Sequence, residues 1–386
     1  MPHFPTVIYE TLLSAPPSPP SWRDSVFPVA PSPEDALLHQ VDLGCRRMIQ
    51  GYLSGCHPHT FFPGGAISSD AWLEPVDGFL QQGDVLSLVD IVVVSTSEYA
   101  TLAVAMLPRM AALAAAKAHA AGADEAVLIF FDRNKSDWCA FEVEGDLVVA
   151  YESLDILLQG GAPTRMRTRT LTRLIQALDS YLYGLNHAPR DRPRKPGIHP
   201  SELSTTDCDR RVAYTVMGQE EKENVDPTLR RIFDVGHVFH HVLQTVLRQA
   251  YGGAFRDEVP IHNKGLQMVG NCDGVLGDVG FEFKSINDNG HKKLRKAKTE
   301  HEEQGVLYAA NLNLTAVHYI YANKETGVLT SYEVSLNRDL WQKMAARSTR
   351  IIRSVESGVL PGRITSDYVC EKCKYSWVCR PGLRRR

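Results

Sequence analysis

The residues best suited to chemistry lie on two neighbouring apolar stretches in the second half of the sequence. Asp273 ends the first stretch, and Glu282 and Lys284 flank a phenylalanine in the second. Side chains alternate between the two faces of a strand, so Glu282 and Lys284 share a face. Two carboxylates can hold a hard divalent cation, and a lysine beside them can position or help deprotonate a water that attacks a phosphodiester. The alternative is an edge hairpin with ordinary surface charges.

Two predicted helices on either side of these strands carry further polar side chains. His240 lies in GHVFHHVLQ, four residues after Gly236, and a neutral imidazole can complete a divalent-metal site. Gln304 and Tyr308 are four residues apart on the later helix and share one face. Taken singly, the histidine fits a core or a cap, and the other pair fits an amphipathic surface. The joint order of these residues is the stronger signal.

Four of the eight cysteines have the spacing of a metal or cluster site. Cys370, Cys373 and Cys379 lie in YVCEKCKYSWVC, whereas Cys208 lies in STTDCDRR, about 160 residues earlier. Four thiolates suit a [4Fe-4S] cluster and equally a tetrahedral zinc ion. Either would tie the end of the chain to the segment before the strands, so we expect a structural role. The remaining cysteines are predicted to be small buried hydrophobic residues: Cys45, Cys56, Cys139 and Cys272.

The order of these motifs resembles that of one nuclease family. GHVFH, then Asp273, EFK and Q-x3-Y follow one another as in the RecB-like branch of the PD-(D/E)XK nucleases. The upstream cysteine with a distal C-x2-C-x5-C is similar to the iron-sulfur exonucleases of CRISPR adaptation and to AddB-type nucleases. The resemblance covers about residues 198–383. It implies a restriction-endonuclease-like mixed α/β sheet flanked by helices.

The resemblance also implies a role for each matching residue. The ligands of Mg²⁺ or Mn²⁺ would be His240, Asp273, Glu282 and the backbone carbonyl of Phe283. Lys284 would activate or orient the water, while Gln304 and Tyr308 would contact DNA and support Lys284. The ligands of a [4Fe-4S] cluster, or of zinc, would be Cys208, Cys370, Cys373 and Cys379. His241 directly follows His240, and the spacing from Gly236 favours His240.

A basic segment and the charge distribution bear on the partner. HKKLRKAK, between the second strand and the later helix, holds Lys292, Lys293, Arg295, Lys296 and Lys298. It is either a solvated loop or a phosphate-binding patch whose DNA binding weakens with salt. The net charge is −3, but residues 197–386 hold 27 Lys and Arg against 23 Asp and Glu. This excess of basic residues is compatible with DNA as a partner.

The sequence divides into two α/β regions. Residues 1–33 contain nine prolines and are predicted to be an extended leader; residues 34–186 form the first region, 187–200 a basic, Pro-rich linker and 201–386 the nuclease-like region. In the first region, a helix is predicted to begin near Ser32–Glu34. It is followed by a strand over 85–95, a helix over 102–121, the strands AVLIFFD and WCAFEVE, and a helix over 168–185. The second is predicted to contain a helix at IFDVGHVFHHVLQTVLRQAY, strands over 267–273 and 280–285, a helix over 300–312, the strands AVHYIYA and TSYEVSL, and a helix over 338–356.

The similar order of elements suggests a weak internal duplication, with VDGFLQQGDVLSLVDIVVVSTS laid on CDGVLGDVGFEFKSIN. This alignment places Ser95–Ser97 opposite the E-x-K motif, so the first copy would have lost its metal site. We expect it to serve as a scaffold for protein or DNA contacts.

Composition narrows the class of protein. Hydrophobic residues make up 44% and charged residues 23% of the 386, as in an ordinary globular protein, and no apolar run is long enough to cross a bilayer. A cytoplasmic setting in a bacterium or a phage-infected host, with reduced thiols, is expected. We predict a metal-dependent DNA exonuclease acting on single-stranded or end-bearing DNA. The alternative is a non-catalytic DNA-binding or assembly subunit, for example of a phage particle, that keeps the fold.

Overall fold

The computed structural model describes residues 4–14, 32–64, 66–68, 73–101, 106–152, 166–187, 195–205, 208–222 and 225–380. In the N-terminal half (residues 4–187), the elements are α1 (Phe4–Ser14), α3 (Pro33–Cys56), β1 (Phe61–Pro63), β2 (Ala66–Ser68), β3 (Leu73–Pro75), β4 (Gly78–Gln82), β5 (Val85–Val94), α4 (Thr96–Ala100), α5 (Leu107–Ala121), β6 (Glu125–Asp132), β7 (Asp137–Glu144), α6 (Leu147–Glu152), β8 (Arg167–Thr170) and α8 (Thr172–His187).

In the C-terminal half (residues 195–380), the elements are α9 (Pro200–Thr205), α10 (Asp209–Val216), α11 (Pro227–Tyr251), β9 (Phe255–Asn263), β10 (Met268–Leu276), β11 (Val279–Ile286), α12 (Asp288–Lys293), α13 (Thr299–Leu312), β12 (Ala316–Asn323), β13 (Leu329–Ser335), α14 (Arg338–Glu356), α15 (Asp367–Glu371) and α16 (Ser376–Cys379).

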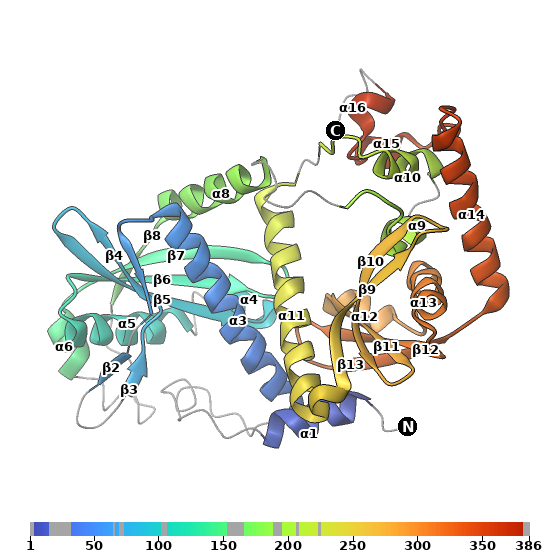
Figure 1. Ribbon diagram of the computed structural model, residues 1–386. Helices are drawn as coiled ribbons and strands as arrows, with labels where there is room; N and C mark the ends of the chain where they lie inside the picture. The colour runs from blue at the N-terminus through green and yellow to red at the C-terminus, as the bar shows by residue number, and fades with distance from the viewer. Residues whose placement is uncertain are drawn as a thin grey trace.

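Each half is built around one mixed sheet that helices cover on both faces, which confirms the predicted α/β class. The strand order is β1-β4-β5-β6-β7-β8 in the first sheet and β13-β12-β11-β10-β9 in the second. Helix α5 packs on one face of the first sheet and α3 and α8 on the other; in the second sheet α11 and α13 cover opposite faces (Figure 1). One layered unit therefore contains the four elements that carry the predicted site residues: β10, β11, α11 and α13.

The two sheets repeat one pattern of strand directions. In the first, β4 is antiparallel to β5, β5 parallel to β6, and β6 antiparallel to β7. The strands β10, β11, β12 and β13 pair in the same three directions. In each half the parallel pair is joined through a helix, α5 or α13, as a parallel connection requires. The two halves thus share one pattern of strand directions, which agrees with the predicted duplication; the duplication itself stays a prediction.

The long helix before each sheet begins with the same local signals. Ser32 accepts a hydrogen bond from the backbone N–H of Asp35, and Asp226 accepts one from that of Leu229. A proline follows each capping residue in the first turn, where its missing N–H removes no helical hydrogen bond. The capping residue and the proline together fix the residue at which α3 and α11 begin.

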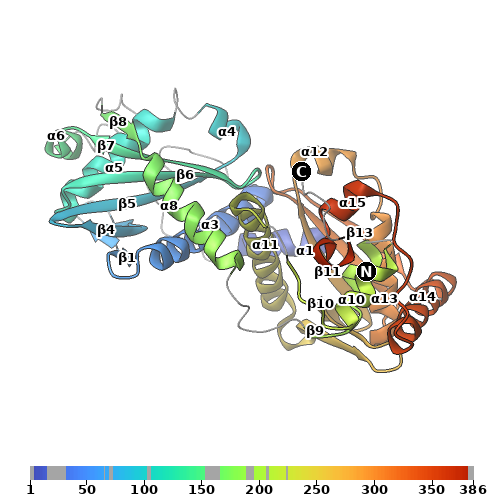
Figure 2. The ribbon, with the colours of Figure 1, turned by 90° about the horizontal axis from the view of Figure 1, so that it is seen from above.

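Helices α3 and α11 cross between the two sheets, as Figures 1 and 2 show. At the crossing, a β-carbon on Gly44 would lie only 2.4 Å from Cγ1 of Val238. Glycine therefore allows the close approach of the two helices. One cluster of buried apolar residues runs through both halves, with Leu37 and Ile49 from α3 and Phe239 and Leu243 from α11 among its members.

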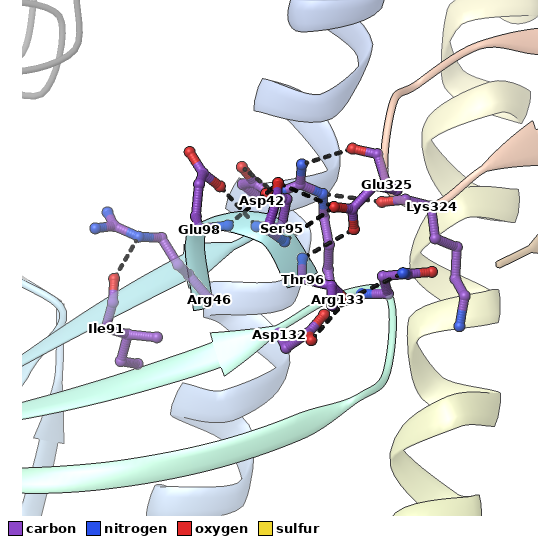
Figure 3. A network of polar contacts seen from close by, with 12 residues as sticks. Asp42, Arg46, Ile91, Ser95, Thr96, Glu98, Asp132, Arg133, Lys324 and Glu325 are labelled. Carbon is purple, nitrogen blue, oxygen red and sulfur yellow. Dashed lines mark hydrogen bonds and ion pairs between the residues drawn. The ribbon is translucent and has the colours of Figure 1, made fainter. Parts of the chain in front are cut away.

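Polar contacts also join the halves, at the ends of β6 and β12 (Figure 3). The Arg133 guanidinium donates to the backbone carbonyls of Lys324 (3.0 Å) and Glu325 (3.2 Å). The Glu325 carboxylate accepts from the backbone N–H groups of Thr96 (2.8 Å) and Ser97 (3.1 Å). Arg133 is only 5% exposed, so these bonds lie in a low-dielectric contact where they are strong.

One expectation is wrong in part, and one stays a prediction. The extended leader is wrong for Phe4–Ser14, which forms helix α1: Phe4 and Ile8, one turn apart, are both buried, and the Phe4 ring contacts that of Phe281 at 4.7 Å. Residues 15–31 lie outside the described part. The boundary over 187–200 stays a prediction, although buried Ile198 already pairs with β10. Across the described residues, no helix is both long and apolar enough to span a membrane.

Candidate active site

The two acids and the lysine predicted from sequence come together on β10 and β11. The strands are antiparallel with Gly274 opposite Phe281, which brings Asp273 alongside the E-x-K residues. The Asp273 Oδ2 atom accepts a hydrogen bond from the backbone N–H of Phe283 at 2.8 Å. The Lys284 Nζ atom lies 2.8 Å from Oε2 of Glu282, so the ammonium and carboxylate form an ion pair.

Helix α11 brings His240 to the same place. Its Nδ1 atom lies 3.4 Å from Oδ2 of Asp273. Phe239, the preceding residue, is fully buried in the core, and His241, the following one, is exposed. The helical repeat therefore turns His240 toward the carboxylates and His241 toward solvent, which is the register that the sequence favoured.

Helix α13 supplies the amide and phenol. Gln304 and Tyr308 are each 4% exposed, and the Gln304 Nε2 atom donates to the Tyr308 hydroxyl at 2.9 Å. The same amide lies 3.4 Å from Oε2 of Glu282, not at Lys284. Gln304 thus reaches Lys284 only through Glu282, which pairs with that lysine. The expected contact of Gln304 and Tyr308 with DNA stays a prediction.

Burial sets the protonation of the cluster. It raises the pKa of Asp273 to about 6 and, together with repulsion from Asp273, that of Glu282 to about 7. Burial and the nearby Lys284 lower the pKa of His240 to about 4, so the imidazole is neutral at physiological pH. Burial alone would lower the pKa of Lys284, but the two carboxylates raise it. The site therefore holds crowded acids beside one neutral imidazole and one ammonium.

Sequence reasoning missed two side chains at this site. Gln244, one helical turn after His240, donates to the backbone carbonyl of Asp273 (3.0 Å) and to the Glu258 carboxylate (2.9 Å). Glu258 has a positive φ of 49°, an unusual conformation for a residue with a side chain. The i, i+4 spacing of His240 and Gln244 was the available signal for the first. No sequence pattern marked Glu258.

A second missed pair lies beside Lys284. The Nδ1 atom of His301 is 2.6 Å from the Tyr321 hydroxyl. Burial, with the charges of Lys284 and Lys298, lowers the pKa of His301 to about 3. His301 precedes Gln304 by three residues on α13, so the i, i+3 rule could have drawn attention to it.

The four cysteines with cluster-like spacing line one cavity, although they come from distant parts of the chain. Cys208 precedes α10, and the other three lie in and around α15 and α16. The cavity is also lined by Arg210, Arg211, Arg363 and Arg380. Burial raises the pKa of the Cys370 and Cys373 thiols, and nearby arginines oppose that rise. Four cysteines and four arginines thus line one cavity.

Polar contacts fasten the C-terminal segment beside this cavity. The Lys374 ammonium lies 3.1 Å from Glu202 and 2.6 Å from Glu221 and is only 5% exposed. The Tyr375 hydroxyl is 2.9 Å from that of Thr215. Residues 374–375 are therefore anchored to the segment around α9 and α10, which places the distal cysteines opposite Cys208.

The basic segment is exposed but not wholly a loop. Lys292 and Lys293 end helix α12, and the other three basic residues follow it without regular structure: Arg295, Lys296 and Lys298. Ion pairs join Lys292 to Asp288 (2.6 Å) and Lys296 to Glu302 (3.3 Å). The segment lies between the end of β11, which carries Glu282 and Lys284, and the start of α13, which carries Gln304.

In the described ranges, no three His, Cys, Asp or Glu side chains are arranged as a ready-made site for a single metal ion. No model of a known protein family matches the chain, and no curated protein sequence matches it.

Solved structures show only remote similarity. The alkaline exonuclease LHK-Exo from Laribacter hongkongensis is 13% identical, with 42% of this chain and 89% of that chain covered and a TM-score of 0.35. Its complex with dAMP gives 15% identity, the same coverage and a TM-score of 0.35. The protein SSO0001 is 17% identical, with 53% and 97% covered and a TM-score of 0.34. These scores are too low to show a shared family, so the proposal below rests on the chain's own geometry.

Proposed function

We propose that the chain is a divalent-metal-dependent deoxyribonuclease whose centre is the cluster on α11, β10 and β11. The observation that carries the proposal is the convergence of His240, Asp273, Glu282 and Lys284, from three elements, at one partly exposed place. Two acids with raised pKa and a neutral imidazole form a donor set that suits Mg²⁺ or Mn²⁺. The ligands would be those three side chains with the backbone carbonyl of Phe283.

The chain's own residues would prepare the reaction in distinct ways. A bound Mg²⁺ or Mn²⁺ would supply charge to activate water and to neutralise the phosphate. The Phe283 N–H and Gln244 hold Asp273 in place, and Gln304 holds Glu282. Lys284, which is protonated and paired with Glu282, can orient the attacking water and stabilise negative charge that develops on the phosphate. The exposed basic segment would bind the DNA backbone.

The substrate that we propose is single-stranded or end-bearing DNA, cut as an exonuclease. The test incubates the full-length protein with end-labelled linear DNA and with closed circular DNA, in Mg²⁺ or Mn²⁺. Lys284→Ala and Asp273→Asn should each lower the cleavage rate by at least about 10²-fold, while Lys343→Ala, an exposed position on α14, should leave it unchanged. Circular dichroism should show all three variants folded.

Two results would contradict the proposal. Cleavage that survives Asp273→Asn in a contaminant-free preparation would remove the acid cluster from the reaction. DNA binding without divalent ions, with no cleavage of any substrate, would instead support the non-catalytic assembly subunit.

We also propose that the four cysteines hold a [4Fe-4S] cluster, with zinc as the competing occupant. The donor set fits either, because four thiols line one cavity. Four thiolates together with either occupant would carry a net negative charge. The arginines that line the cavity would offset this charge. The role would be structural, since the cavity lies between α10 and the C-terminal helices and apart from the acid cluster.

A further inference from the structure

The N-terminal half contains counterparts of Asp273, of Gln244 and of the Phe283 backbone N–H, and hydrogen bonds fix the correspondence. Asp77 lies directly before β4, and Asp273 lies near the end of β10. Each aspartate is followed by a glycine. The Asp77 Oδ2 atom accepts from the backbone N–H of Ile91 at 2.7 Å, as Asp273 Oδ2 accepts from Phe283 at 2.8 Å. Ile91 and Phe283 therefore hold equivalent positions on β5 and β11.

The helices that cover these strands correspond in the same way. Gln50 on α3 donates to the backbone carbonyl of Asp77 at 2.8 Å, and Gln244 on α11 donates to that of Asp273 at 3.0 Å. The two glutamines are thus equivalent, and the residues one turn before each of them must be equivalent too.

That position holds Arg46 in the N-terminal half and His240 in the C-terminal half. The Arg46 guanidinium lies 3.4 Å from Oδ2 of Asp77, the same distance that separates His240 Nδ1 from Asp273 Oδ2. Arg46 also lies 3.9 Å from Asp90. Arg46 donates to the backbone carbonyl of Ile91 as well, as Figure 3 shows.

The E-x-K motif has its counterpart at Asp90 and Val92, because Ile91 corresponds to Phe283. The earlier placement of Ser95–Ser97 opposite E-x-K is therefore wrong: Ser95 caps α4 as Asn287 caps α12, at the ends of the two strands. The acid of the motif is kept as Asp90. The lysine is replaced by an apolar residue.

A second cation reaches Asp90 from helix α5. The Lys117 Nζ atom lies 3.2 Å from Oδ2 of Asp90. Backbone hydrogen bonds at the helix ends, from Ala123 to Ala118 and from Leu314 to Ala309, make Lys117 the counterpart of Tyr308. The N-terminal centre thus has a guanidinium in place of the imidazole and an ammonium in place of the phenol.

The acids and cations of the N-terminal centre are buried, so their charges must compensate one another. Asp77, Asp90 and Lys117 are at most 4% exposed and Arg46 is 8% exposed. A buried charge is tolerated when an opposite charge and hydrogen bonds compensate it. Two acids and two cations leave the N-terminal centre neutral. In the C-terminal centre an imidazole stands where the guanidinium stands in the N-terminal centre, and a phenol stands where the Lys117 ammonium stands.

We propose that the N-terminal half is a silenced copy of the C-terminal centre, in which Arg46 and Lys117 occupy the place of a divalent cation and conceal a latent Mg²⁺ or Mn²⁺ site on Asp77 and Asp90. The C-terminal metal site, with which it is compared, belongs to the proposed function. The latent site itself follows from the paired geometry of the two halves.

The test removes the two cations from the full chain and counts bound Mn²⁺ by calorimetry and electron paramagnetic resonance. The variant Arg46→His with Lys117→Tyr, which copies the C-terminal residue types, should bind one more Mn²⁺ per chain than the natural protein. Adding Asp77→Asn and Asp90→Asn to that variant should abolish the extra ion. Arg47→His, on the exposed side of the same helix, is the matched control and should change nothing.

Each outcome of this test supports or overturns the latent metal site. A folded double variant that binds no additional Mn²⁺ overturns the proposal. If the double variant unfolds without metal, saturating Mn²⁺ should refold it, and failure to refold also counts against the proposal. An extra ion in the variant with none in the natural protein would uphold the latent site and contradict the proposed C-terminal metal site.

Discussion

At the scale of single residues, the two halves show two solutions to one electrostatic problem. Asp77 and Asp273 accept the same backbone hydrogen bond, but a guanidinium faces the first and a neutral imidazole faces the second. The raised pKa values of Asp273 and Glu282 are the mark of acids that lack sufficient compensating charge. This makes the C-terminal centre costly to fold at high pH when no cation is bound.

Glu282 should therefore destabilise the metal-free protein as pH rises. Its pKa is raised to about 7 in the folded chain by burial and by Asp273, so the folded state keeps the proton to higher pH than the unfolded state, and stability falls as pH rises toward 7. Relative to Glu282→Gln, the natural protein should lose unfolding free energy between about pH 4.5 and 7.5, measured by urea denaturation in EDTA. Glu356→Gln, at the exposed end of α14, should show no such trend. A natural protein that instead gains stability against Glu282→Gln would reverse the sign that burial requires.

Residue types and short spacings made the C-terminal cluster predictable. Asp273, Glu282 and Lys284 follow strand alternation, and His240 and Gln304 follow the helical repeat, so local rules were enough to align them. Glu258 could not be found, because its place depends on a positive-φ residue in β9. The N-terminal centre was not predictable for a different reason: its second cation lies on helix α5 and not on the strand, and no motif connects Lys117 with Asp90.

At the scale of elements, the crossing of α3 and α11 decides how the halves meet. The long helices and the central strands were predictable from apolar periodicity and capping, but β1, β2, β3, β4, β8 and β9 were missed. In β9, FRDEVPIHN mixes charges with a proline at the edge of the sheet. The crossing itself depends on the absence of a side chain at Gly44, which the sequence marks only as a glycine within a helix.

Adding one methyl group at this crossing should weaken the fold. Gly44→Ala would set a β-carbon against Val238 and should cost about 1–3 kcal/mol of unfolding free energy through overpacking. Gly51→Ala, on the same helix with nothing within 4 Å, should instead stabilise by about 0.5–1 kcal/mol. Val238→Ala should recover most of the loss in the double variant. Equal effects at Gly44 and Gly51, measured by urea denaturation, would mean that the helices do not approach as closely as described.

At the scale of the whole molecule, long-range contacts fasten the chain at three places. Helix α1 packs against the C-terminal sheet, Arg133 joins the ends of β6 and β12, and Lys374 anchors the last segment to α9 and α10. Sequence separation hid the first two, because neither carries a motif. Only the cysteine spacing indicated the third.

Replacing the most distant thiol should therefore affect the whole fold. In an anaerobic preparation the natural protein should be brown and contain about four irons per chain, if the cavity holds the cluster that four thiolates suit. Cys208→Ser should lose most of the iron and the visible absorbance and unfold at a lower temperature, because it opens a loop of about 160 residues. Cys139→Ser, outside the cavity, should keep both. A colourless natural protein with one zinc per chain would assign the cavity to zinc.

Helix α11 bears on both the interface and the chemistry. Val238 meets Gly44 on one side of this helix, and His240, two residues later, faces Asp273 on the other. A substitution that shifts α11 at its crossing with α3 would therefore also move the imidazole relative to Asp273.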